Sequence, residues 1–192
     1  RIDAPAARQR LSLPAWIPGS YLLREFAKNL QKLRATQGRR KPVLQQLDKA
    51  TWQVDCQSGD EGGQPLELHY EICAFDPSVR TAWLDAQRGF FHGTSVCLRA
   101  EGQTDSPCTL QIAAPAPGTT AERWQRATAP HPPNVARPGL GLYHAADYAA
   151  VAHPPLEPGL SWRPAFDVPR VPPRFLSAGA PAARHAHPPL PA

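Results

Sequence analysis

The histidines are the first residues to test for chemistry, because a zinc site in a hydrolase is often built on the pattern HExxH. In that pattern two histidines one helical turn apart ligate the metal, and the glutamate acts as general base. None of the seven histidines is followed by glutamate. His185 and His187 form an HAH pair in a proline-rich tail, without a carboxylate or cysteine beside them. We therefore predict no metal ligand and no cofactor-binding residue in this chain.

Sequence patterns for other kinds of catalysis are missing as well. A nucleophile elbow needs GxSxG, but residues 93–97 are GTSVC, and Ser95 falls in a predicted strand. The chain contains neither GxxxxGK[ST] nor GxGxxG. The four cysteines form no CxxC pair, and we expect Cys56, Cys73 and Cys97 to lie in strands as small buried side chains. The sequence thus predicts a chain with no catalytic residue, which is not an enzyme on its own.

The most distinctive segment is a loop at residues 13–26, LPAWIPGSYLLREF. Proline presets φ and glycine accepts a positive φ, so Pro18 and Gly19 predict a type II turn. A rigid loop of this kind, with aromatic side chains and an arginine, could line a binding cleft. An equally weighted alternative is that Trp16, Tyr21 and Phe26 only cap the end of a sheet. The candidate cleft residues are Trp16, Pro18, Gly19, Ser20, Tyr21 and Arg24.

The length and net charge of the chain indicate how large a core it can form and which partners its charge could attract. The 192 residues can form one sizeable core, and they carry a net charge of +5. Ten Lys or Arg residues lie within positions 1–41, a charge that could bind nucleic acid. Because no nucleic-acid motif accompanies them, a solvated basic face is favoured. The absence of Met predicts that Arg1 is an internal start. We expect no membrane span and a reducing, cytoplasmic location.

Proline divides the predicted secondary structure. Only six of the 24 prolines precede residue 97, so regular strands are expected mainly in the first half. Apolar residues alternate with polar ones in the segments 11–15, 52–56, 66–74, 81–83, 96–98 and 110–114. Glu67, His69 and Glu71 occupy the alternate positions of the third segment, so that strand should be wet on one side. The pattern predicts a mainly β fold, an antiparallel sandwich or a curved open sheet.

Helical spacing is limited to residues 20–33, with Ser20 as N-cap, and residues 145–151. We therefore expect one or two short helices. Residues 163–192 are proline-rich and lack periodicity, which predicts an extension or linker. The expected organisation is a β-domain over residues 1–162, followed by this extension.

Several short motifs follow one another along the first half of the chain. They are Pro14-x-Trp16-x-Pro18-Gly19-Ser20-Tyr21, Arg24-Glu25-Phe26, Leu47-Asp48-Lys49, Thr51-Trp52, Tyr70-Glu71, Ser78-Val79-Arg80-Thr81-Ala82-Trp83-Leu84-Asp85 and Arg88-Gly89-Phe90-Phe91-His92-Gly93-Thr94-Ser95. Together these motifs resemble the N-terminal domain of the glycyl aminopeptidase family of zinc metallopeptidases. The resemblance is dense over residues 9–100 and thins afterwards, with departures from the family pattern at Ala152, Pro158 and Pro173.

The resemblance implies a larger protein with three parts: this β-domain, a gluzincin-type zinc domain carrying HExxH, and a PDZ domain. It implies that zinc belongs to the full-length protein, and that the catalytic domain of the same polypeptide is the partner of this chain. The loop from Trp16 to Arg24 is then the candidate contact with that domain or with the amino end of a peptide substrate. The alternative is a stand-alone β-sandwich binding module that has lost its enzyme.

Overall fold

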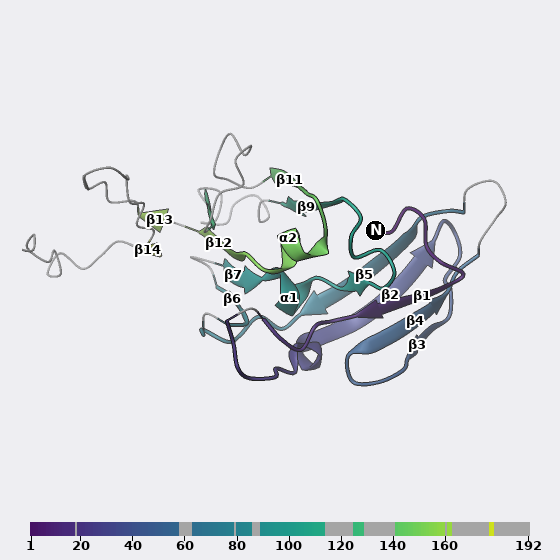
Figure 1. Ribbon diagram of the computed structural model, residues 1–192, viewed down its shortest axis with the longest axis horizontal. Coiled ribbons are helices and arrows are strands. Elements are labelled where there is room, and N and C mark those ends of the chain that lie inside the picture. Colours follow the sequence, from purple (N-terminus) through teal and green to yellow (C-terminus); the bar gives the residue numbers. More distant parts are fainter. Residues whose placement is uncertain are drawn as a thin grey trace, which may run out of the picture.

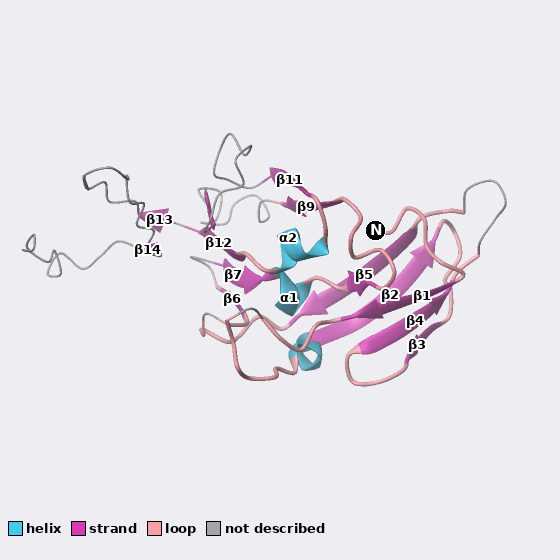
Figure 2. Cartoon of the chain, viewed as in Figure 1, coloured by secondary structure: helices cyan, strands magenta, loops and turns pink. Residues whose placement is uncertain are grey.

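The computed structural model describes residues 1–17, 19–57, 63–78, 80–85, 89–113, 125–128, 141–159, 161–162 and 177–178. Strands dominate, and the helices are single turns (Figures 1 and 2). No helix in these ranges is both long and apolar enough to cross a membrane. The elements in chain order are β1 (Arg8–Ser12), η1 (Phe26–Asn29), β2 (Leu30–Gln37), β3 (Leu44–Gln46), β4 (Thr51–Asp55), β5 (Leu66–Ile72), β6 (Ala82–Leu84), β7 (Gly89–His92), α1 (Gly93–Val96), β8 (Arg99–Ala100), β9 (Cys108–Ile112), β10 (Gln125–Thr128), β11 (Gly141–Ala145), α2 (Tyr148–Ala152), β12 (Pro155–Gly159), β13 (Ser161–Trp162) and β14 (Ser177–Ala178).

All described strand pairs are antiparallel. One sheet has the order β3-β4-β1-β8, and β2 pairs with β5 in a second. The strands of both sheets run alongside one another through one half of the molecule (Figure 1). The other half holds α1, α2 and the sheet β10-β12-β7-β6, with β9 paired to β11. This arrangement of open antiparallel sheets confirms the predicted mainly β class.

The core lies between the first two sheets. Leu11 of β1, Val54 of β4 and Leu66 of β5 are fully buried. Trp52 of β4 and Ala35 of β2 belong to the same buried cluster. Each sheet contributes alternate side chains, as a period of two along a strand requires. Glu67, His69 and Glu71 face solvent along β5, so the prediction of a strand with one wet side is confirmed.

The predicted helix at residues 20–33 is wrong except for one turn. Residues 26–29 form the 3-10 turn η1, and β2 begins at Leu30. Pairing with β5 gives β2 a ladder of backbone hydrogen bonds and buries Ala35, which local helical spacing could not anticipate. The register shifts between Gln31 and Arg34, and Lys32 within this irregularity has a positive φ of 53°.

Other local predictions have mixed outcomes. The second helix is confirmed as α2, with Asp147 as its N-cap accepting a hydrogen bond from the Ala150 backbone at 2.7 Å. The strand at residues 96–98 is wrong, because α1 includes Val96 and β8 begins only at Arg99. The strand placement of Cys56, Cys73 and Cys97 is wrong, because β4 ends at Asp55, β5 ends at Ile72 and Cys97 follows α1. Cys73 is also exposed, and all four cysteines are free. The predicted extension at 163–192 lies outside the described residues except for β14, and the boundary at 162 stays a prediction.

Candidate functional site

The loop between β1 and η1 begins with a tight turn. The Ser20 backbone N–H donates to the Ile17 carbonyl at 3.1 Å, and Gly19 has a φ of 79°. That left-handed conformation at the third position of a four-residue turn is the one that type II geometry requires. Pro18, the predicted second residue of the turn, lies outside the described residues.

Both ends of this loop are fixed to the core. The Arg24 backbone N–H donates to the Ala15 carbonyl at 2.6 Å, which closes the loop at its base. Ile17 is 4% exposed and Phe26 is 2% exposed, so an apolar anchor lies on each side. Within the loop, the Trp16 indole N–H donates to the Ser20 carbonyl. The loop is therefore a structured projection held by hydrogen bonds and buried anchors.

The tip of the loop presents apolar side chains to solvent. Tyr21 and Leu23 have relative exposures of 104% and 85%, and Leu22 and Trp16 have exposures of 62% and 48%. No residue from 11 to 23 carries a charge. Tyr21 is therefore not packed against the sheets, whereas Phe26 is buried in the core. Scattered exposed apolar residues are ordinary, but a contiguous group on an ordered loop is typical of an interaction site.

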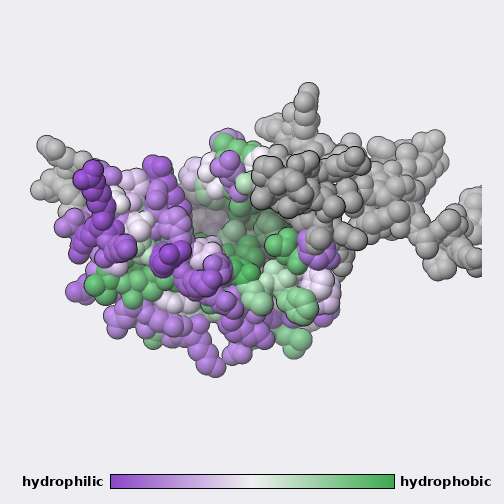
Figure 3. Space-filling view, turned by 180° about the vertical axis from the view of Figure 1, so that it is seen from behind, coloured by the Kyte–Doolittle hydropathy of each residue, from purple (hydrophilic) through white to green (hydrophobic). Residues whose placement is uncertain are grey.

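A second set of exposed apolar side chains lies near β6. Phe75 stacks on Trp83 with ring centroids 5.2 Å apart, and 77% of Phe75 is exposed. Leu84, the next residue of β6, is 60% exposed. Figure 3 shows apolar residues gathered on the side of the molecule where the loop and β6 lie. We call this set the apolar surface; its members are Trp16, Tyr21, Leu22, Leu23, Phe75 and Leu84.

An electrostatic interaction joins Arg24, at the base of the loop, to Asp76, the residue after Phe75. The backbone N–H of Ser78 donates to the Asp76 carboxylate at 2.8 Å and is the main cause of a lowered Asp76 pKa. The positive charge of Arg24 also lowers this pKa, which places Arg24 in electrostatic range of Asp76. Arg24 is half-buried, and its Nε atom is buried without a hydrogen-bond acceptor among the residues described.

The sequence prediction and the structure overlap in one loop. Trp16, Gly19, Ser20, Tyr21 and Arg24 come together as the candidate list required, although their role stays a prediction. Sequence reasoning missed four members of the apolar surface: Leu22, Leu23, Phe75 and Leu84. Leu23 lies in the segment 20–33 that was expected to be helical, whereas the structure places it in an exposed loop. The uncharged run from residue 11 to 23 was the feature that could have identified the loop as an exposed apolar projection.

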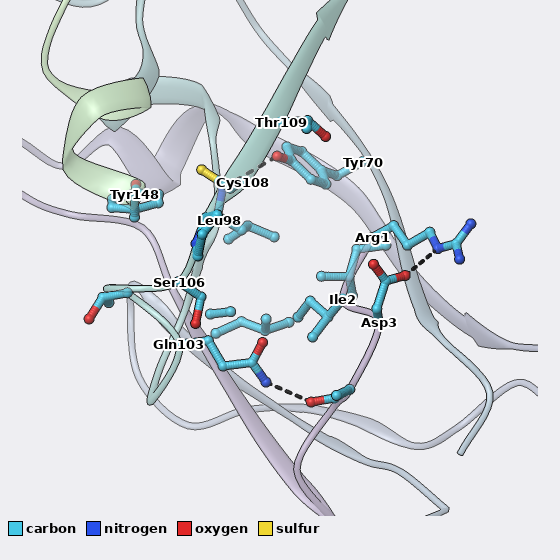
Figure 4. A pocket seen from close by; sticks show the side chains of 16 residues that line it. Arg1, Ile2, Asp3, Tyr70, Leu98, Gln103, Ser106, Cys108, Thr109 and Tyr148 are labelled. Atoms are coloured by element: carbon cyan, nitrogen blue, oxygen red, sulfur yellow. Dashed lines mark hydrogen bonds and ion pairs between the residues drawn. The ribbon is translucent and has the colours of Figure 1, made fainter. Parts of the chain in front are cut away.

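A cavity of about 550 Å³ lies elsewhere, between the first residues of the chain, β5, β8 and α2. Figure 4 shows Tyr70, Leu98 and Ile2 around its open centre, with the Arg1–Asp3 pair at one side. The Tyr70 hydroxyl donates to the Val96 carbonyl at 2.8 Å, and burial raises its pKa to about 12. A hydroxyl with such a pKa, already bound to the backbone, is unsuited to acid–base catalysis at neutral pH.

In the described part of the chain, no group of three or more His, Cys, Asp or Glu side chains could hold a metal ion. His185 and His187 lie outside the described residues. The loop and β6 present the exposed apolar surface, and the half-buried Arg24 lies at the base of the loop.

Comparisons with known proteins bear on the family and the fold of the chain. The family model described as the peptidase M61 N-terminal domain matches residues 1–159. Among solved structures, the chain is similar to the crystal structure of the aminopeptidase N family protein from Idiomarina loihiensis, with 34% sequence identity and a TM-score of 0.80. That match covers 93% of this chain and only 29% of the other chain. No curated protein matches the sequence.

Proposed function

Because the chain belongs to the family of peptidase M61 N-terminal domains, we propose that it is the non-catalytic N-terminal domain of a zinc-dependent aminopeptidase. In this proposal the apolar surface docks on the catalytic domain of the same polypeptide and flanks its substrate cleft. The observation that carries the proposal is the ordered, uncharged loop with Tyr21 and Leu23 almost wholly exposed.

The size of the solved relative supports a partner within one polypeptide. About seven-tenths of that chain has no counterpart here, since the match covers 29% of it. The described residues do not fit a zinc ion, so zinc would be bound by the catalytic domain, where it would activate water for peptide hydrolysis. The contribution of this chain is then to shape and stabilise one side of the cleft.

The composition of the apolar surface suits contact between domains. Interface centres are depleted of charge and enriched in aromatic residues, as here with Trp16, Tyr21 and Phe75. The alternative contact, with the amino end of a peptide, is less well supported, because the cationic Arg24 at the loop base would repel an ammonium group. We therefore assign the loop to the domain interface.

The test compares two leucines that are both exposed in this chain. Leu23→Ser alters the apolar surface, whereas Leu142→Ser on β11 serves as the matched control, with Leu142 57% exposed. Both variants are made in the parent polypeptide extended past Ala192. Full burial of a leucine is worth about 1.5–3 kcal/mol, so Leu23→Ser should lower the unfolding midpoint of the parent and its aminopeptidase activity.

In residues 1–192 alone, both variants should change stability by less than about 0.5 kcal/mol, because exposed side chains contribute little there. Hydrogen exchange gives the second measurement: backbone amides of residues 21–23 should exchange more slowly in the parent than in the shorter chain. Equal exchange in both chains, with equal effects of the two leucine variants, would favour a stand-alone binding module.

A further inference from the structure

Two charged residues, Arg24 and Glu25, stand at the base of the exposed loop. Glu25 pairs with Lys49 at 3.3 Å, whereas the buried Nε atom of Arg24 has no hydrogen-bond partner within the described structure. The Arg24 backbone is fixed by the 2.6 Å bond to Ala15, so the side chain emerges from a defined position. Its Nε atom is buried, yet no acceptor among the described residues reaches it. A guanidinium is charged at all relevant pH values and presents five donors.

The nearby Asp76 does not meet this need. Its carboxylate accepts the Ser78 backbone N–H at 2.8 Å, and within the described part of the chain it forms no hydrogen bond or ion pair with Arg24. The attraction between the two groups acts at longer range. Arg24 therefore keeps donors for a group that comes from outside the described structure.

Docking of the apolar surface would remove water from the arginine. Leu23 and Phe75 are exposed by 85% and 77%. The half-buried Arg24 follows Leu23 in the chain and acts electrostatically on Asp76, the residue after Phe75, so a partner that covers both apolar side chains would also cover Arg24. An arginine buried without a partner is costly by several kcal/mol, so the docked face must supply an acceptor. A carboxylate fits best, because its two oxygens match the guanidinium fork.

We infer that Arg24 binds an aspartate or glutamate side chain of the docked catalytic domain, and so acts as the charged anchor of the interface. This inference rests on the proposed function, since it names the chemistry of the partner face. It assigns Arg24 to binding between domains and gives it no part in peptide hydrolysis.

Carbodiimide cross-linking tests the inference directly, because the reagent joins an amine to a carboxylate in contact with it. The parent polypeptide extended past Ala192 carries Arg24→Lys, and peptide mapping by mass spectrometry locates the new amide bonds. The parent with native Arg24 is the matched control, since it has no amine at this position. The exposed pair of Lys49 and Glu25, 3.3 Å apart, shows in both samples that coupling has occurred.

The expected product links position 24 to an Asp or Glu beyond residue 192. A link only to Asp76, or no link at position 24 while Lys49 and Glu25 are joined, would overturn the inference. Amide exchange of residues 21–23 in the same samples separates the two proposals. If exchange at residues 21–23 is slow but the expected link is absent, the docking proposal holds and the binding role of Arg24 is wrong. If exchange is as fast as in residues 1–192 alone, both the docking proposal and the binding role of Arg24 are wrong.

Discussion

Gly93 offers a sharp test of how the structure supports the loop. This glycine begins α1, which contacts both α2 and η1, the turn that follows the exposed loop. A Cβ atom added at Gly93 would lie 2.5 Å from the Val151 carbonyl oxygen and 2.7 Å from the Ala152 Cα atom. Both are backbone atoms of α2, so neither can move away as a flexible side chain would.

Gly93→Ala should therefore destabilise the chain. Overpacking of this kind costs typically about 1–3 kcal/mol, and removing a helical glycine returns at most about 1 kcal/mol. For a chain of this length, a net loss of about 1–2 kcal/mol lowers the thermal midpoint by roughly 2–8 °C. Circular dichroism at 218 nm or differential scanning calorimetry would measure it, with urea unfolding as a check on the free energy.

Gly102→Ala is the matched control, because the added Cβ would meet no atom within 4 Å there. Its φ of 82° still imposes a strain of about 1–2 kcal/mol on alanine. The Gly93 variant should also increase amide exchange in α2, which the Gly102 variant should leave unchanged. A Gly93 variant as stable as the native chain, with α2 exchange unaltered, would refute the close approach of α1 and α2.

Two further predictions concern buried polar groups. Thr94→Val should stabilise the chain by about 1 kcal/mol in urea unfolding, because the Thr94 hydroxyl is buried without a hydrogen-bond partner among the described residues; a loss of stability would reveal a partner. Burial alone would raise the pKa of Glu101, but hydrogen bonds from Ser12 and Arg99 and the Arg99 charge outweigh it and lower this pKa. The free energy of unfolding that ionised Glu101 contributes is thus fully present above its unfolded pKa near 4.5 and is lost as the pH falls through its folded pKa. The native chain should therefore exceed Glu101→Gln in unfolding free energy by less at acidic pH, whereas an equal difference in unfolding free energy from pH 7 to pH 3 would contradict this.

The parts of the fold that were predictable from sequence are those in which one strand face is buried. Leu66, Leu68 and Tyr70 alternate with Glu67 and His69, and the alternation follows directly from burial on one side of β5. The helical turn expected over residues 145–151 is present as α2, but it begins later, at Tyr148, where the Asp147 carboxylate accepts a backbone N–H at the helix N-terminus.

The parts that were not predictable depend on partners distant in sequence. Leu30 and Leu33 have spacing that fits a helix, yet they lie in β2 because β5 supplies the hydrogen bonds. Leu23 lies in the segment expected to be helical, but it stands in a loop closed by the bond between Arg24 and Ala15 and is 85% exposed. Phe75 joins the same surface from a segment fifty residues away in the chain.

The candidate site shows the same division. The turn at Gly19 follows from the conformational freedom of glycine and was predictable as a local feature. The unmet hydrogen-bonding capacity of Arg24 was not, since it depends on which acceptors the fold brings within reach of the buried Nε atom. Such a shortage becomes visible only when the surrounding groups are placed in space.

The proposed role of this chain is that of a non-catalytic domain serving a zinc peptidase active site in the same polypeptide. It can be tested by comparing residues 1–192 with the parent polypeptide extended past Ala192 in an assay for release of N-terminal residues from peptides. We expect no release by residues 1–192, and release by the parent that a chelator abolishes and zinc restores. A parent that releases nothing with zinc present, or release by residues 1–192 alone, would contradict it.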